Sequence, residues 1–235
     1  MTQSTKYVRL DIWRVPTIRI AQANLFMATH RLPLRKTPAL SFFKLVGTGS
    51  GQTFTMRDAD LHHWAVLTVW NDQDSRDNFD NNKVFRQWQA ISSEHAVINM
   101  TPLSSRGTWN QQQPFGQPTP TQFAGLHAAL TRATIKPRWW REFWRSVPPV
   151  SADLNSSPGL RFAIGIGEAP VGMQGTFSLW SDNNSITQFA SQRQAHAQVI
   201  QKTHATGWYS EELFARFMVT RVDGSFEGAA LGAQS

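Results

Sequence analysis

Hydrophobic and polar residues along the first part of the chain follow two spacings, which together predict a mixed order of strands and helices. Residues 8–15 alternate and are rich in β-formers, which predicts a strand. A helix is predicted over residues 18–32, because apolar residues recur there at helical spacing on one face. That face consists of Ile18, Ala21, Leu25, Ala28 and Leu32. Apolar runs at residues 39–46, 64–70 and 95–103 predict three more strands. A second helix, broken near residues 81–82, is predicted before the last strand.

This order, β-α-β-β-α-β, is the ferredoxin-like pattern, and it occurs twice. A polar segment rich in Pro and Gln, residues 110–122, has the composition of a linker. After it, strands are predicted at residues 125–133, 159–166 and 210–222, a helix at 137–147, and a strand–turn–helix unit at 175–200. The two halves share landmarks 110 positions apart: Trp70, Asp72 and Phe79 recur as Trp180, Asp182 and Phe189.

The expected fold is α+β, with two ferredoxin-like repeats whose four-stranded sheets face each other as an α/β barrel, of the dimeric α/β-barrel type, within one chain. We assign residues 1–109 to the first repeat, 110–123 to the linker, 124–223 to the second repeat and 224–235 to a flexible tail. Such a barrel can leave a cavity between its sheets. The glycine-rich turn at residues 47–51 lacks the Lys-Ser/Thr of a phosphate loop, so its glycines are expected to permit a bulge or a close backbone approach.

Composition restricts the chemistry that is open to the chain. Its 235 residues include no Cys, which excludes disulfides, iron–sulfur clusters, thiolate-ligated haem and Cys nucleophiles. The net charge is +7, but the Lys and Arg residues form no long block, which argues against nucleic-acid binding. Ten Trp and fifteen Phe suit a core and can also line a pocket for a flat apolar ligand. With neither a signal peptide nor a membrane-spanning apolar run evident, a cytoplasmic protein is expected.

The repeated strand–turn–helix unit differs between its two copies at a position that matters for function. Where the first helix has Arg86, the second has His196. On a helical projection, Arg193 lies near the centre of the apolar face, and His196 lies beside Phe189. An Arg on an apolar stripe needs an anionic partner, and a His on the same face can bind a metal. Haem offers both, as an iron that takes an axial imidazole and two propionates. The alternative is a hydrogen-bonded core histidine, with Arg193 paired to a carboxylate.

Other histidines give weaker signals. His127 lies in a predicted strand, where its ring is expected to be satisfied by a hydrogen bond. His62 and His63, near Asp58 and Asp60, hint at non-haem iron, but adjacent side chains on a strand point in opposite directions.

The segment KPRWWREFWR at residues 136–145 combines three Trp with four cations. Trp140, Phe143, Trp144 and Val147 form a helical stripe that is typical of a core. Trp139 and the Arg residues could instead touch a membrane surface.

Five blocks of the sequence resemble the spheroidene monooxygenase (acyclic carotenoid ketolase) family. They are FKLVGTGSG at residues 43–51, PLSSRGTW at 102–109 with PF at 114–115, GIGEAP at 165–170, GTFSLW at 175–180 and WYSEELFARF at 208–217. The last block is the most specific, and the resemblance extends over roughly residues 8–222.

The resemblance implies a haem-containing monooxygenase that uses dioxygen and an electron donor to oxidise an apolar, carotenoid-like substrate. The family has a His on the helix before the Trp-Tyr block, and His196 occupies that position here. Its placement supports His196 as the ligand of the haem iron. Arg161, Arg193 and Arg216 are candidates for pairing with the propionates, and Phe189 for contact with the haem. Peripheral membrane contact and a homo-oligomer are further expectations.

Three other interpretations stay open. The chain could be a haem lyase or dehydratase acting on a nitrogenous small molecule, a haem-binding protein without turnover, or a cofactor-free barrel that binds an apolar ligand.

Overall fold

The computed structural model describes residues 5–49, 59–168, 173–192 and 206–232. The strands of the first repeat are β1 (Tyr7–Arg14), β2 (Leu40–Gly49), β3 (Ala59–Trp70) and β4 (Glu94–Gly107). Its helices are α1 (Ile20–Thr29), α2 (Arg31–Arg35), α3 (Gln73–Asp77) and α4 (Lys83–Ile91), with 3₁₀ turns at Thr17–Arg19 and Asn78–Asn81. The predicted helix break is confirmed, because Asn82 begins α4 afresh by accepting a 2.8 Å hydrogen bond from the Val84 amide.

The second repeat follows the same order. It contains β5 (His127–Ile135), a 3₁₀ turn at Pro137–Trp139, α5 (Trp140–Asn155), β6 (Leu160–Gly167), β7 (Met173–Trp180), α6 (Asn183–Gln192) and β8 (Tyr209–Phe226). The repeated Trp-x-Asp turn is a repeated helix cap. Asp72 accepts a 2.8 Å hydrogen bond from the Ser75 amide, and Asp182 accepts a 2.7 Å bond from the Ser185 amide.

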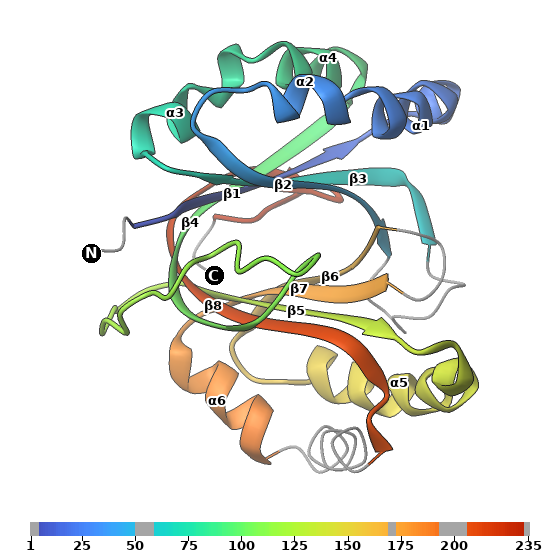
Figure 1. Ribbon diagram of the computed structural model, residues 1–235, viewed down its shortest axis with the longest axis vertical. Helices are drawn as coiled ribbons and strands as arrows, with labels where there is room; N and C mark the ends of the chain where they lie inside the picture. The colour runs from blue at the N-terminus through green and yellow to red at the C-terminus, as the bar shows by residue number, and fades with distance from the viewer. Residues whose placement is uncertain (1–4, 50–58, 169–172, 193–205, 233–235) are drawn as a thin grey trace.

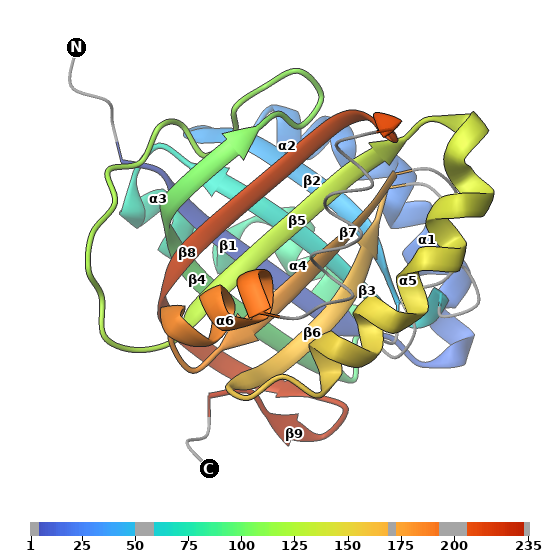
Figure 2. The ribbon, with the colours of Figure 1, turned by 90° about the horizontal axis from the view of Figure 1, so that it is seen from below.

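The strands join in one sheet in the order β4-β1-β3-β2-β6-β7-β5-β8, and pairing of β4 with β8 closes it into a barrel. Figure 1 shows α1 to α4 on one side of the stacked strands and α5 and α6 on the other. Figure 2 shows α5 and α6 over the outer face of β5 to β8. The predicted fold class and the barrel of two ferredoxin-like repeats are therefore confirmed.

The two halves meet at seams of unequal length. Strands β4 and β8 pair through a long register that runs from Ala96 to Gly107, whereas β2 and β6 pair only at their glycine-rich ends. There Gly47 lies opposite Gly167, and Gly49 lies opposite Gly165. The pairing of β2 with β3 also shifts register between Gly47 and Thr48. The glycines thus permit both the bulge and the close backbone approach expected from the sequence.

In the described part of the chain, buried apolar side chains pack in the space between the two sheets, where the sequence had allowed for a cavity. Side chains alternate along each strand, so that every second residue points into the barrel. Inward residues of both repeats form one buried apolar cluster that includes Leu10, Ile98, Leu130, Phe177 and Phe217. Any site for a large ligand must therefore lie elsewhere, on the helix-covered faces or at the barrel ends.

The segments assigned to the linker and the tail both contact the barrel. Phe115 of the linker is buried, with its ring edge-on to Phe217 at 4.9 Å. Strand β8 runs past residue 223 to Phe226 and turns back into β9 (Ala229–Ala230). The expectation of a flexible tail from residue 224 is therefore wrong, because residues 225–230 form a β-hairpin.

The apolar face predicted for the first helix points away from the core. The buried residues of α1 are Ala23 and Phe26, whereas Leu25 on the predicted face is exposed. In the part of the chain that the structure describes, none of the helices is long and apolar enough to span a membrane.

Candidate functional site

The sheet register shows which positions of the two repeats correspond. Trp70 lies opposite Leu40 in the first repeat, and Trp180 lies opposite Leu160 in the second. Just after these pairs, the register of both strand pairings shifts by one residue, between Leu40 and Phe42 in the first repeat and between residues 160 and 162 in the second. On the other side, Trp70 and Trp180 pair with β1 and β5. Outward-facing positions can therefore be compared one by one.

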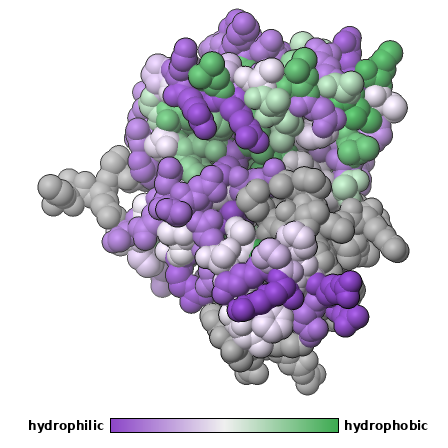
Figure 3. All heavy atoms as spheres, turned by 45° about the vertical axis from the view of Figure 1, so that its right-hand side comes forward, coloured by the Kyte–Doolittle hydropathy of each residue, from purple (hydrophilic) through white to green (hydrophobic). Residues whose placement is uncertain are grey.

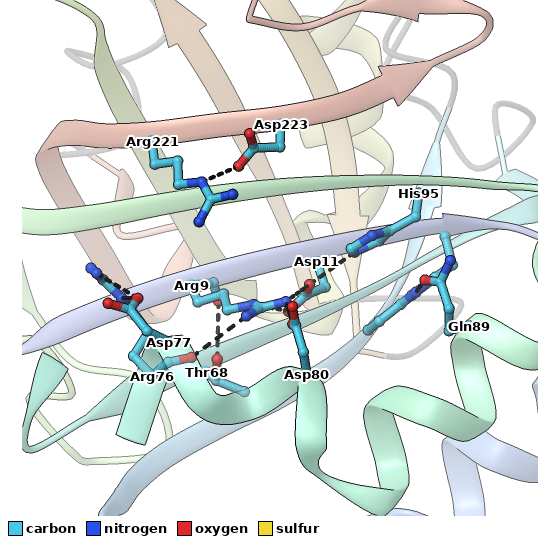
Figure 4. Close-up of polar contacts among 11 residues, drawn as sticks. Arg9, Asp11, Thr68, Arg76, Asp77, Asp80, Gln89, His95, Arg221 and Asp223 are labelled. Carbon is cyan, nitrogen blue, oxygen red and sulfur yellow. Dashed lines mark hydrogen bonds and ion pairs between the residues drawn. The ribbon is translucent and has the colours of Figure 1, made fainter. Parts of the chain in front are cut away.

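In the first repeat, large and charged side chains fill the space between the sheet and its helices. Arg9, Asp11 and Trp13 point outward from β1, and all three are buried. Arg9 donates to Asp11 at 2.9 Å and to Asp80 at 2.5 Å, while the Nε2 atom of His95 lies 2.9 Å from Asp11 (Figure 4). This outer face is closed by its own side chains.

Asp11 is the most enclosed charge of that network. Complete burial acts to raise its pKa, but the Arg9 guanidinium and the hydrogen bonds from Arg9 and His95 outweigh burial and hold the pKa below its ordinary value. The carboxylate is therefore ionised and fully engaged. The network stabilises the fold and offers no oxygen to a ligand.

The second repeat has small side chains at the corresponding positions. Where β1 has Arg9, Asp11 and Trp13, β5 has Ala129, Thr131 and Ala133. Where β2 and β3 have Phe43, Leu45 and Val66, β6 and β7 have Ala163, Gly165 and Thr176. These six small residues, which we name the second-repeat floor, all remain partly exposed, although α5 and α6 lie over this face (Figure 2). The sheet therefore does not fill the space beneath its own helices.

Aromatic side chains and one cation border this floor. The ring of Phe189 on α6 lies 5.6 Å from that of Trp180, and Phe189, Ala129 and Ala163 all pack against the buried cluster of Leu154, Trp180 and Ile186. Arg216 on β8 is the direct cross-strand neighbour of Ala129. The floor therefore has an aromatic wall and a guanidinium beside it, both at the α6 side.

Arg216 is half-buried, yet the side chains on α6 that accept its hydrogen bonds are neutral. It donates to Asn183 Oδ1 and Thr187 Oγ1, both at 3.2 Å. Burial lowers the pKa of Arg216 from its ordinary value. Among the residues that the structure describes, no carboxylate forms an ion pair with it, so an anionic group beside α6 would find a partly desolvated cation.

The predicted site residues thus divide into two groups. Phe189 and Arg216 lie beside the second-repeat floor, and Arg161 is exposed on β6, one of the strands that form it. His196 and Arg193 fall outside the described residues.

The weaker histidine candidates have ordinary partners. His62 Nδ1 lies 2.9 Å from the Val15 carbonyl, whereas His63 Nδ1 lies 2.5 Å from Asp60, so the adjacent rings point in opposite directions, as expected. His127 Nδ1 lies 2.9 Å from the Gly125 carbonyl. Within the described ranges, no three His, Asp or Glu side chains are grouped so as to hold a metal ion.

Comparison with known proteins identifies the relatives of this chain. Spheroidene monooxygenase of Rhodobacter capsulatus is 37% identical over 208 residues, which cover 86% of this chain and 85% of that protein. The chain belongs to the spheroidene monooxygenase family. Spheroidene monooxygenase of Rubrivivax gelatinosus is 29% identical and covers 94% of this chain and 87% of its own length. Family membership makes the chain a monooxygenase. No family model matches the sequence.

Solved structures support the fold. An aldoxime dehydratase superposes with a TM-score of 0.62 at 9% identity, over 93% of this chain and 83% of that one. This likeness concerns the barrel architecture alone.

Four of the five sequence blocks in which the resemblance was noted contribute a residue to, or lie beside, a buried charge cluster. Lys44 and Arg132, both less than a tenth exposed, form ion pairs with Glu168 and Glu211 respectively. Trp109 donates its indole hydrogen to Glu168 at 2.5 Å, and the Arg132 guanidinium lies 3.5 Å from the same carboxylate. The cluster links β2 to the end of β6 and β5 to β8, so it stabilises the closure between the repeats.

The charge cluster was not foreseen from the sequence, although it left a signal there. Lys44 interrupts the apolar run of β2 at an inward position, and Arg132 does the same on β5. Two cations at inward positions require two inward carboxylates. Sequence spacing alone could not identify those carboxylates, because Glu168 is 124 positions from Lys44.

A pocket of about 350 Å³ opens beside this cluster, where β2 separates from β6. Its walls include Phe42, Phe43 and Lys44 of β2, and its rim includes Arg31 and Arg35 of α2. Most of its lining comes from β2 and α2 of the first repeat, and the rest comes from Asn110, Gln112 and Glu168.

Proposed function

We propose that this chain is a haem-dependent monooxygenase that uses dioxygen to oxidise an apolar, carotenoid-like substrate. The class of substrate comes from the relatives, which are named spheroidene monooxygenases. Haem with His196 as its iron ligand is the cofactor that the family resemblance implies.

The observation that carries the proposal is the second-repeat floor. A haem is flat and apolar, and it needs a surface from which large side chains are absent. The floor provides such a surface under α5 and α6, whereas Arg9, Asp11 and Trp13 fill the corresponding space of the first repeat. This contrast would explain why a duplicated fold carries one cofactor, in the repeat whose sequence contains His196.

The residues beside the floor have distinct roles in this proposal. Trp180 and Phe189 exclude water and contact the apolar part of the ring system. Arg216 pairs with a propionate, which supplies the anion that its described neighbours lack. Hydrogen bonds from Arg216 to Asn183 and Thr187 meanwhile tie α6 to β8 and hold the helix in place. When bound, haem supplies the activation of dioxygen.

A haem titration of the purified full-length chain tests the cofactor. Wild-type protein is expected to develop a Soret band at one haem per chain. The variant His196→Ala is expected to lose that band while keeping its far-ultraviolet circular dichroism. His62→Ala is the matched control, because His62 contacts the Val15 carbonyl in the first repeat, and it should bind as wild type does. The cofactor assignment fails if the wild-type chain binds no haem or if His196→Ala keeps an unchanged Soret band.

A turnover assay distinguishes the monooxygenase from a haem lyase and from a haem-binding protein without turnover. The haem-loaded chain, supplied with a reductant, is expected to consume dioxygen and to insert oxygen into an acyclic carotenoid. Anaerobic dehydration of an aldoxime would favour the lyase instead. Haem binding without either reaction would indicate a carrier.

A further inference from the structure

The helical layer of the first repeat carries an apolar stripe that faces solvent. Ile18 is 87% exposed, Leu25 58% and Leu32 59%. The opposite side of the same segment is buried through Phe26 and Leu34. Large aliphatic side chains at this exposure are ordinary when they are scattered, but a continuous row of them indicates a contact surface.

The three residues form such a row. They are seven positions apart, and seven residues are close to two full helical turns, so their side chains lie on nearly the same line. Ala21 and Ala28, which are also exposed, lie between them. His30, which joins α1 to α2, has helical backbone angles, so the second helix continues the first. The stripe is about 20 Å long at 1.5 Å per residue.

The stripe lies in a part of the chain that has cations and no acidic residues. Between Asp11 and Asp58 the sequence contains seven Lys and Arg residues and not one Asp or Glu. This excess equals the net charge of the whole chain, +7. Five of the seven are exposed: Arg14, Arg19, Arg31, Arg35 and Lys36. The positive charge therefore accumulates on the helical layer that carries the stripe.

Acidic residues of the same layer lie away from the stripe. Asp74 and Asp77 belong to α3, which Figures 1 and 2 both place at the opposite side of the molecule from α1. Asp77 is paired with Arg76, and Asp80 with Arg9. Figure 3 shows hydrophobic residues gathered over the upper part of the molecule, where α1 and α2 lie, next to strongly hydrophilic side chains.

We propose that the outer face of α1 and α2 docks on the surface of a bilayer that contains anionic lipids. Leu25, Leu32 and Ile18 would enter the boundary between headgroups and acyl chains, and Arg31, Arg35 and Lys36 would contact lipid phosphates. An apolar face bordered by Arg14, Arg19, Arg31, Arg35 and Lys36 complements an anionic lipid surface. Arg31 and Arg35 also line the pocket at the β2–β6 separation, so that pocket is adjacent to the docking face.

Helix α5, the aromatic and basic segment that the sequence suggested for membrane contact, is less suited to it. The ring of Trp139 lies 6.4 Å from that of Trp208, and the ring of Phe143 lies at the same distance from it. None of the strongly exposed large hydrophobic residues in the described part of the chain belongs to α5. The described aromatic side chains of α5 and of the preceding 3₁₀ turn therefore pack onto the protein, whereas Arg138 of that turn and Arg141 and Arg145 of α5 are exposed cations.

Cosedimentation of the full chain with vesicles tests the proposal. The protein is expected to pellet with vesicles of equal parts phosphatidylcholine and phosphatidylglycerol, to stay in solution with phosphatidylcholine alone, and to be released as salt is raised. Two double variants, Leu25→Gln with Leu32→Gln and Arg31→Gln with Arg35→Gln, are each expected to weaken binding roughly tenfold to thirtyfold. Near-ultraviolet circular dichroism checks that they are folded.

Two matched controls make the outcome specific. Arg138→Gln with Arg141→Gln removes equal charge from the start of α5 and the 3₁₀ turn before it, and Leu61→Gln removes a leucine that is 55% exposed on β3. Both are expected to bind vesicles as wild type does. The proposal is overturned if wild type does not distinguish the two vesicle types, or if only the α5 variant loses binding. It is also overturned if the Leu25 and Leu32 variant dissociates a dimer in sedimentation velocity while vesicle binding is absent or unchanged, since the face would then be a protein interface.

Discussion

Replacing Ala163 by Phe gives the second repeat the side chain that Phe43 has at the corresponding position of the first. Ala163 lies on the second-repeat floor, is partly exposed, and packs against the buried cluster that contains Trp180. If the space over the floor is open for a cofactor, the new ring will occupy it. We therefore expect Ala163→Phe to block haem binding without harming the haem-free fold.

The sign of the stability change distinguishes open space from packed space. Burying a phenylalanine ring in an open site stabilises by about 1.5–3 kcal/mol at most. For a chain of this length, each kcal/mol raises Tm by roughly 2–4 °C. If side chains already filled the space, overpacking would instead cost about 1–3 kcal/mol. The two cases differ in sign, so thermal unfolding of the haem-free protein separates them.

The assay combines that unfolding curve with a haem titration. Ala163→Phe is expected to leave Tm of the haem-free protein unchanged or higher and to weaken haem binding at least tenfold. The control is Leu45→Ala in the first repeat. Leu45 is only 5% exposed, so its truncation should cost about 2–5 kcal/mol and leave haem affinity unchanged. A destabilised Ala163→Phe protein with wild-type haem affinity would refute the assignment of the floor.

Three further predictions concern stability, each followed by urea unfolding. Glu168→Gln leaves two buried cations without their shared carboxylate and should cost about 3–5 kcal/mol; an unchanged unfolding midpoint would contradict the role of the charge cluster. Gly107 has a φ of +91°, and Gly107→Ala would place a methyl group against a carbonyl of β8. Gly228 has a similar φ of +78° but open space around it, so Gly228→Ala is the control. Gly107→Ala should therefore lower the free energy of unfolding by about 1–3 kcal/mol more than Gly228→Ala does. The pKa values of Asp11 and Glu211 are held below their ordinary 3.8 and 4.5, because nearby cations and hydrogen bonds outweigh the burial that acts to raise them. Since these folded pKa values are depressed, stability should be full above about pH 5 and fall as pH drops through those ordinary values; a free energy of unfolding equal at pH 6 and pH 3.5 would contradict this.

The elements that the sequence predicted well are those that depend on near neighbours. Alternation located the strands to within a few residues at most ends, and the Trp-x-Asp turns marked helix caps that the structure contains twice. The main errors were at the chain end, where β8 and β9 occupy part of the expected tail. A tail of small residues carries little periodic signal, and pairing with β8 supplies the order that the local sequence does not predict.

The candidate site likewise has features that the sequence predicted and features that only the tertiary structure revealed. The repeat, the difference between Arg86 and His196, and the family resemblance were all visible in the linear sequence. The difference in side-chain size between the two repeats was not, because it appears only when the register aligns Ala129 with Arg9 and Ala163 with Phe43.

What the sequence determined by itself is therefore the order of strands and helices, their duplication and the family. These follow from spacing over a few residues and from similarity along the chain. Only the tertiary structure decided which apolar face is buried, which charges meet, and where the interior is full. Leu25 and Leu32 have a core-like spacing but face solvent, because the other side of the same segment presents Phe26 and Leu34 to the sheet. Burial depends on what packs opposite a side chain, and that partner is chosen by long-range strand pairing.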